Sequence, residues 1–102
     1  MGYYTNYKIE LIRGNRKEFL SLLDRLAEIS QYPELKDGYA YLIKWYHWLE
    51  NSIEVSKEFP NILFMIEGEG EDFDDIWRCY FKNGDGKQIF MVWPEINLDD
   101  LC

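Results

Sequence analysis

Residues 76–93, IWRCYFKNGDGKQIFMVW, decide the fold of this chain. Aromatic and branched side chains fill two short runs, 76–82 and 87–93, on either side of the turn sequence Asn83-Gly84-Asp85-Gly86. Asn-Gly and Asp-Gly pairs readily adopt the positive φ angles that tight hairpin turns need. This stretch therefore predicts a β-hairpin.

The N-terminal part of the chain predicts a strand followed by a helix. Between residues 3 and 12 apolar and polar side chains alternate, as they do in a half-buried strand. Asn15 is followed three residues later by Glu18, a relative of the capping box that begins a helix. We expect this helix to end before Pro33. The residues expected on its buried face are Phe19, Leu22, Leu23, Leu26 and Ile29.

The middle of the chain predicts a second strand, a second helix and a third strand. Residues 39–46 are aromatic and branched enough to form a short strand. An amphipathic segment that ends at Pro60 follows it and predicts a helix. The inward face expected for that helix consists of Leu49, Ile53, Ser56 and Phe59. Residues 62–66 are apolar throughout, as in a strand covered on both faces. They run into Glu67-Gly68-Glu69-Gly70-Glu71, where we expect an exposed, glycine-rich end.

These elements follow one another as strand, helix, strand, helix and three strands. That order favours an α+β fold in which two helices pack on one face of an open, mostly antiparallel sheet (β-α-β-α-β-β-β). With 102 residues, of which 47% are hydrophobic, the chain has room for one core. We therefore expect residues 1–102 to form a single domain.

The charge and the absence of certain patterns exclude several classes of protein. The chain has 11 basic and 19 acidic residues, and its net charge of −8 repels phosphate backbones, so we do not expect direct binding to nucleic acid. No stretch is long and apolar enough to span a membrane, and the N-terminus lacks the pattern of a signal peptide. Cys79 and Cys102 form no C-x-x-C pair. We expect a cytoplasmic protein.

Several short runs carry a resemblance to known proteins: Trp45-Tyr46, 56–64, Glu67-Gly68-Glu69-Gly70-Glu71, Asp75-Ile76-Trp77 and 80–84. Over roughly residues 40–84 the chain resembles a group of small uncharacterised proteins from phages, prophages and bacteria. It is more distantly similar to ferredoxin-like domains of mobile elements. The resemblance implies a ferredoxin-like variant of the fold and an origin in a mobile element, and it brings no catalytic residues.

Residues 67–75, here called the acidic segment, contain six carboxylates between two predicted strands. These are Glu67, Glu69, Glu71, Asp72, Asp74 and Asp75. The segment does not fit an EF-hand loop, because Asp72 stands where the turn glycine belongs and Arg78 where the bidentate acid belongs. Carboxylates near a sheet edge can pair with lysines and arginines of a nucleic-acid-binding protein and so copy the charge of a phosphate track. The alternatives are a solvated loop that keeps the sheet edge from aggregating, adventitious binding of a divalent cation, and a catalytic pair of acids, which would need an enclosed cleft that this glycine-containing loop does not suggest.

A second concentration of residues is aromatic and comprises Tyr39, Tyr41, Trp45, Tyr46 and Trp48. Five large rings within ten residues are too many for a short strand and a helix start to bury, so we expect some of them to be exposed. Tyrosine and tryptophan are frequent in interface hot spots, and Tyr41, Trp45 and Tyr46 are our candidate partner contacts. The alternative is that these rings fill the core of a small domain.

The sequence offers little support for catalysis. His47 is the only histidine, which excludes a site that needs two. It could act as a base for Cys79 only if the fold brought the two together. Phosphate-binding loops, dinucleotide-binding glycine motifs and serine-hydrolase elbows do not occur in the sequence. We predict no catalytic residue, no metal and no cofactor.

Two functions from different classes remain. The first is a non-enzymatic interaction protein, encoded by a phage or prophage, whose acidic face occupies a basic surface of a host protein such as a nuclease or a defence complex. Such an inhibitor would act as an anti-CRISPR-like mimic of nucleic acid. The second is a small-ligand or nucleotide-binding module in which Tyr41, Trp45 and Trp77 form a stacking wall at an oligomer interface.

Overall fold

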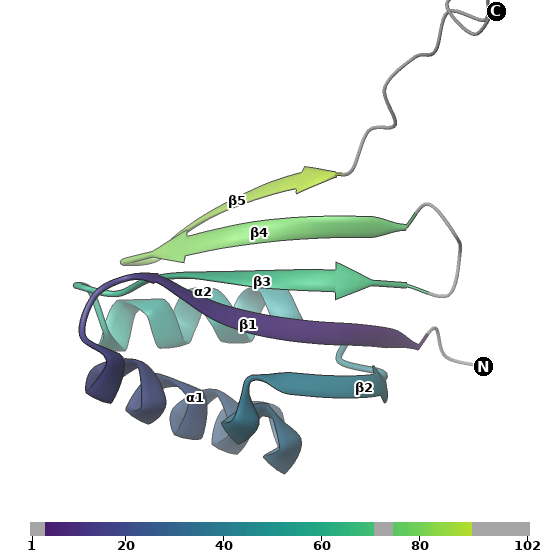
Figure 1. The fold of residues 1–102 in the computed structure, drawn as a ribbon, viewed down its shortest axis with the longest axis horizontal. Helices are drawn as coiled ribbons and strands as arrows, with labels where there is room; N and C mark the ends of the chain where they lie inside the picture. Colours follow the sequence, from purple (N-terminus) through teal and green to yellow (C-terminus); the bar gives the residue numbers. More distant parts are fainter. Residues whose placement is uncertain (1–3, 71–74, 91–102) are drawn as a thin grey trace, which may run out of the picture.

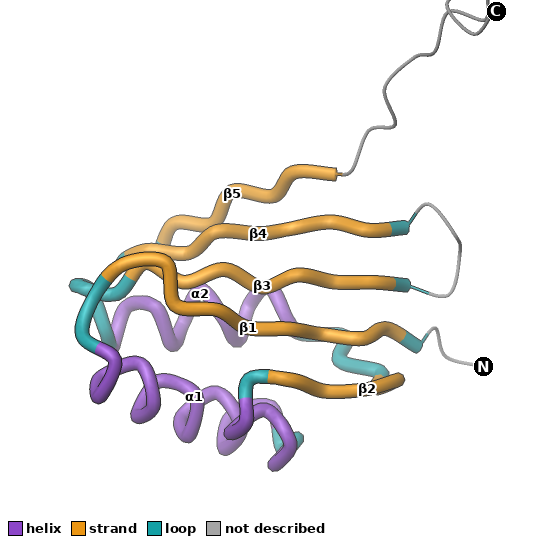
Figure 2. The backbone as a smooth tube through the Cα atoms, viewed as in Figure 1, coloured by secondary structure: helices purple, strands orange, loops and turns teal. Residues whose placement is uncertain are grey.

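The computed structural model describes residues 4–70 and 75–90, which form two α-helices, a 3₁₀ turn and a five-stranded sheet (Figure 1). In chain order the elements are β1 (Thr5–Arg13), α1 (Arg16–Ser30), η1 (Pro33–Asp37), β2 (Tyr39–Ile43), α2 (Trp48–Glu58), β3 (Leu63–Glu69), β4 (Ile76–Lys82) and β5 (Asp85–Phe90). The strands lie in the order β2-β1-β3-β4-β5, and each neighbouring pair is antiparallel. Both helices pack against one face of the sheet (Figure 2). The predicted α+β arrangement is confirmed.

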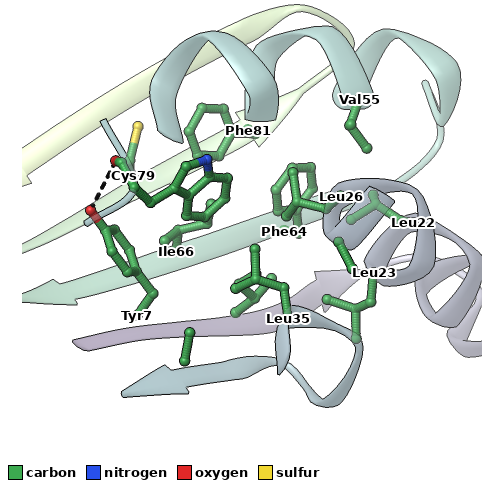
Figure 3. Close-up of a cluster of buried hydrophobic side chains, with 14 of the residues drawn as sticks. Tyr7, Leu22, Leu23, Leu26, Leu35, Val55, Phe64, Ile66, Cys79 and Phe81 are labelled. Atoms are coloured by element: carbon green, nitrogen blue, oxygen red, sulfur yellow. Dashed lines mark hydrogen bonds between the residues drawn. The ribbon is translucent and has the colours of Figure 1, made fainter. Parts of the chain in front are cut away.

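The core lies between that face of the sheet and the two helices. The strand register places three rows of residues side by side across β1, β3 and β4: Tyr7, Gly68 and Trp77; Ile9, Ile66 and Cys79; Leu11, Phe64 and Phe81. Phe64 and Phe81 stack with their ring centres 5.2 Å apart. Helix α1 contributes fully or nearly fully buried leucines to this core, and Trp48 of α2 packs on Trp77 and Phe81 of β4 (Figure 3 shows the leucines). The buried residues of α1 are Phe19, Leu22, Leu23, Leu26 and Ala27, which confirms most of the predicted face.

Helix α1 begins where the capping residue predicts. The side chain of Asn15 accepts a hydrogen bond of 3.1 Å from the backbone N–H of Glu18, so one of the free amides of the first turn is satisfied. The helix ends at Ser30, three residues before Pro33. Gln31 follows in a left-handed conformation with a φ of 67°, which closes the helix.

The predicted hairpin is present, with a turn shorter than the sequence suggested. Asn83 and Gly84 alone form the turn, with φ angles of 46° and 87°. Two positive φ angles are all that a two-residue hairpin turn needs, so Asp85 already pairs with Lys82 across the ladder. Strand β5 therefore begins two residues earlier than expected. The remainder of the predicted strand, residues 91–93, lies outside the described residues.

The predicted inward face of α2 is confirmed for Ser56 and wrong for Leu49, while Ile53 and Phe59 are partly buried against the core. Ser52, Val55 and Ser56 are buried on it, whereas Leu49 is 37% exposed. Small serine side chains allow the helix to approach the sheet, and the predicted inward face did not include the buried Ser52. The Oγ of Ser56 is satisfied, because it donates to Ile53 O at 2.6 Å and accepts from the backbone N–H of Gly84 at 2.8 Å.

The start of the acidic segment is strand rather than exposed loop. Strand β3 continues through Glu67 and Gly68 to Glu69, and Gly68 is buried. A Cβ atom at Gly68 would lie only 2.2 Å from the Trp77 ring, so the indole occupies the space where a side chain would stand. The glycine that suggested an exposed turn is therefore needed for close packing inside the sheet.

Strand β2 is shorter than predicted and ends in a bulge. Tyr41 and Leu42 both lie between the paired positions Ala40 and Ile43, while β1 has only Asn6 at the corresponding place. Leu42 has a φ of 52°, which is rare for this residue type, and its N–H donates to Asn6 Oδ1 at 2.8 Å. The side chains of Tyr41 and Leu42 are 65% and 46% exposed as a result. Within the described ranges, no helix is long and apolar enough to cross a membrane.

Candidate functional site

One residue of the acidic segment, Asp75, and three residues of the aromatic cluster meet in a hollow of about 230 Å³ at one end of the sheet. We call it the aromatic hollow. It is lined by Thr5, Tyr7, Trp45, Tyr46, Trp48, Asp75 and Trp77. These residues come from the start of β1, the connection from β2 to α2, and the start of β4. Asp75, Trp45 and Tyr46 were each predicted as contact residues.

Asp75 lies at the end of the connection between β3 and β4, directly before the first residue of β4. Its carbonyl oxygen accepts a hydrogen bond of 2.8 Å from the N–H of Gly70, so the ladder between the two strands closes at this point. Its side chain is partly exposed. Burial raises the pKa of Tyr7 to about 12, and the nearby charge of Asp75 contributes to this rise. The carboxylate therefore lies close enough to the rings of the hollow to act on them electrostatically.

Tyr46 stands on a connection that is fixed by its neighbours. The Tyr32 hydroxyl donates to Lys44 O at 2.8 Å, and the Tyr7 hydroxyl donates to Trp45 O at 3.3 Å (dashed in Figure 3). The indole N–H of Trp45 donates to Asn51 Oδ1 on α2 at 2.8 Å. Tyr46 itself is 67% exposed. An exposed ring is thus carried by an anchored backbone.

Four rings pack against one another beneath Tyr46. Trp48 and Trp77 stack with their ring centres 4.2 Å apart and their planes 25° apart. Tyr7 meets Trp45 and Trp77 edge to face, with ring centres 5.2 Å and 6.0 Å away. Trp45 and Trp77 are 3% and 7% exposed. These two tryptophans form the base of the hollow and belong to the core, so their role at a contact surface is limited to the edges that reach it.

The remaining residues of the acidic segment do not form one continuous cluster in the described part of the chain. Glu67 lies on the sheet face away from the helices, where its Oε1 accepts from Arg78 Nε at 2.9 Å. Glu69 is exposed at the end of β3. Glu71, Asp72 and Asp74 lie outside the described residues. No group of three potential metal ligands occurs within residues 4–70 and 75–90.

The stacking wall proposed from Tyr41, Trp45 and Trp77 is not assembled. Tyr41 projects from the β2 bulge and does not line the aromatic hollow, whereas Trp45 and Trp77 are buried. The hollow is also smaller than the roughly 300–1,000 Å³ typical of small-molecule pockets. It has the size for a single side chain rather than for a nucleotide.

The surroundings of Cys79 and His47 do not fit the nucleophile and base that the sequence analysis considered. Cys79 is fully buried, and burial raises the pKa of its thiol to about 11, so it is the neutral thiol near pH 7. His47 is exposed before the first turn of α2, where its Nδ1 lies 2.7 Å from Glu50 Oε2. Neither arrangement activates a thiol for attack.

Two residues of the hollow were missed by the sequence analysis. Thr5 and Tyr7 lie at the start of β1, some seventy residues from Asp75 in the sequence. The alternation of β1 places Tyr7 on the buried face, but only the antiparallel pairing of β1 with β3, and of β3 with β4, brings it near Trp77 across Gly68. Local sequence patterns carry no such signal.

No family model matches the chain, and neither a curated protein nor a solved structure is significantly similar to it. The relationship to phage and prophage proteins and to ferredoxin-like domains stays a prediction. The functional argument for this chain therefore depends on its own residues.

Proposed function

We propose that this chain is a non-enzymatic interaction protein of the cytoplasm that occupies a basic surface on a host protein. The observation that carries the proposal is that Asp75, from the acidic segment, and the exposed Tyr46 line the same hollow. A basic partner would find there a carboxylate for its cationic groups beside an aromatic ring for close packing. The net charge of −8 supports attraction of such a partner over longer distances.

The acidic segment indicates the class of partner. Glu69 is exposed at the end of β3, and Glu71, Asp72 and Asp74 continue the same segment in the sequence. Closely spaced carboxylates present negative charge to the same lysines and arginines that bind a phosphate backbone. We take the partner to be a nucleic-acid-handling protein, such as a nuclease or a defence complex. The chain would then inhibit it as a phage- or prophage-encoded, anti-CRISPR-like mimic of nucleic acid.

The test is capture of host proteins on the tagged chain, compared with a variant in which Glu69, Glu71, Asp72 and Asp74 are all changed to lysine. We expect the wild-type chain to retain a basic nucleic-acid-handling protein at low salt and the variant to lose it. Retention should also weaken as salt rises, because charges separated by more than about 8–10 Å are screened at ordinary ionic strength. Circular dichroism shows whether the variant keeps its fold.

A matched control changes the charge by the same amount on the helical side of the molecule. Asp24, Glu34, Asp37 and Glu54 are exposed on α1, η1 and α2, and all four are changed to lysine in this control. The proposal requires that this control still captures the partner. Equal capture by both lysine variants, or equal loss in both, would show that the acidic segment is not the contact.

A further inference from the structure

We propose that the aromatic hollow binds the guanidinium group of an arginine side chain that projects from the basic partner. The inference rests on the proposed function, since it assigns the anchor residue of that partner. It commits to one chemistry, a planar cation on a flexible side chain. The argument uses the size of the hollow, its rings, its carboxylate and the rigidity of its walls.

The hollow has the dimensions and the lining of a site for one cationic side chain. Its volume is about 230 Å³, below the range of pockets that enclose drug-sized ligands. Tyr46 and Trp48 come from the connection and the first turn of α2, and both are more accessible than the buried tryptophans beneath them. The negative face of an aromatic ring attracts a cation that lies within about 6 Å of the ring centre. The exposed ring of Tyr46 and the part of Trp48 that Trp77 does not cover are thus the rings that a cation can reach.

Asp75, which also lines the hollow, supplies the complementary charge. Its backbone is fixed by the hydrogen bond from Gly70, and its charge acts on Tyr7 at the base of the hollow. A planar guanidinium group can lie flat against an aromatic ring while its N–H groups donate to a carboxylate. The ammonium group of a lysine is compact and more strongly hydrated, so it gains less from such a site.

The walls of the hollow are preorganised, which lowers the cost of binding. Three hydrogen bonds hold the connection from β2 to α2, and the stacked pair of Trp48 and Trp77 joins α2 to β4. A ligand would not have to order these groups when it binds. A cation of this chain already uses ring contact nearby, since Lys44 Nζ lies 4.6 Å from the centre of the Tyr4 ring. Neither Lys44 nor Tyr4 lines the hollow, so that contact does not occupy it.

The direct test is an NMR titration of the ¹⁵N-labelled chain with N-acetyl-arginine amide. We expect the indole N–H signals of Trp45, Trp48 and Trp77 to shift, with a dissociation constant on the order of 1–10 mM, as suits one charge pair and one or two ring contacts. N-acetyl-citrulline amide has nearly the same shape without the charge, and we expect it to leave these signals in place. N-acetyl-lysine amide should bind several-fold more weakly than the arginine derivative.

Variants locate the binding in the hollow. Tyr46→Ala and Asp75→Asn should each weaken arginine binding by about 3- to 10-fold. Tyr39→Ala removes an exposed tyrosine of β2 that does not line the hollow, and it should leave the affinity unchanged. The proposal is overturned if the indole signals do not shift up to about 50 mM ligand. It is also overturned if citrulline or lysine binds as well as arginine, or if Tyr39→Ala has the same effect as Tyr46→Ala.

Capture of the partner separates this inference from the proposed function. One outcome is that Tyr46→Ala captures the basic partner as well as wild type does, while the four-lysine variant of the acidic segment does not. That result supports the acidic surface as the contact and shows that the arginine site is wrong. If the arginine derivative binds the hollow but no basic protein is captured, the site stands and the proposed function is wrong. Loss of the partner in both variants supports both proposals.

Discussion

Gly68 shows how a single residue determines the local structure of this sheet. It is buried on β3 opposite Trp77, and the indole fills the volume that a side chain at position 68 would need. The same indole forms the base of the aromatic hollow and stacks on Trp48. The absence of one Cβ atom thus links the packing of the core to the shape of the hollow.

We predict that Gly68→Ala destabilises the fold, although alanine in a strand is usually the more favourable residue. The new methyl group would stand 2.2 Å from the Trp77 ring, and overpacking of this kind costs about 1–3 kcal/mol. Urea denaturation measures the loss. The double variant Gly68→Ala, Trp77→Phe removes the colliding part of the indole, so the cost of the alanine should be smaller in that background than in wild type. Additive effects would show that the ring does not cause the loss.

Cys79 predicts a defined dependence of stability on pH. Burial raises the pKa of the folded thiol from near 9 to about 11, so both states are protonated below pH 9 and the thiol contributes no pH dependence there. Between pH 9 and 11 the unfolded chain loses this proton while the folded chain keeps it, so the free energy of unfolding falls as pH rises.

The test compares Cys79→Ala with wild type by urea denaturation at pH 8, 9 and 10 in a Cys102→Ser background. The stability advantage of wild type over Cys79→Ala should shrink by about 1 kcal/mol from pH 9 to pH 10, since one pKa unit corresponds to about 1.4 kcal/mol. Other groups titrate equally in both proteins and cancel in the difference. A difference that stays constant over this range would mean that the thiol is not held neutral by burial.

At the scale of elements, variants of Val55 and Leu49 test which side of helix α2 faces the core. Val55 is fully buried, whereas Leu49, which has the larger apolar side chain, is 37% exposed. Val55→Ala removes two buried methyl groups and should lower the free energy of unfolding by about 2 kcal/mol. Leu49→Ala should lower it by less than about 1 kcal/mol. Thermal or urea denaturation measures both losses, and a larger loss for Leu49→Ala would mean that Leu49 rather than Val55 packs in the core.

The elements differ in how far the sequence predicts them. Local chemistry determines the N-terminus of α1 and the hairpin turn, because the Asn15 cap and the Asn83-Gly84 pair act on their immediate neighbours. Which side of α2 faces the sheet depends instead on which side chains let the helix approach it. Ser52 is polar and small, and nothing in its sequence neighbourhood distinguishes it from an exposed serine.

The sequence predicted only part of the candidate site, because it shows local composition but not which distant strands pair. Charge density indicated Asp75 and aromatic density indicated Tyr46, since composition alone shows both. That the two share a hollow with Thr5 and Tyr7 follows from strand order, which places the start of β1 beside the end of β3, and the end of β3 beside the start of β4. Pairings between distant strands leave no periodic pattern in the sequence. The burial of Trp45 likewise depends on its bond to Asn51 and on Tyr7.

At the scale of the whole molecule, the sheet is asymmetric in the pairing and burial of its strands. Strands β1 and β3 each have a hydrogen-bonded neighbour on both sides and contribute buried residues to the core. Strand β5 pairs only with β4, and all six of its residues are exposed, including Ile89 and Phe90. Opening of β5 therefore breaks a ladder of hydrogen bonds while it uncovers little apolar surface.

We predict that amide hydrogen exchange follows this gradient across the sheet. The turn closes on the pair of Lys82 and Asp85, and alternate residues along β5 then donate to β4, so the amides of Lys87 and Ile89 are hydrogen-bonded within the hairpin. These amides should exchange on the order of 100-fold faster than those of Phe64 and Ile66 in β3, because local opening of an edge strand suffices to expose them. Exchange measured residue by residue by NMR provides the comparison. Equal protection of β5 and β3 would mean that the edge strand is held by contacts beyond its pairing with β4, and the molecule would then unfold as one cooperative unit.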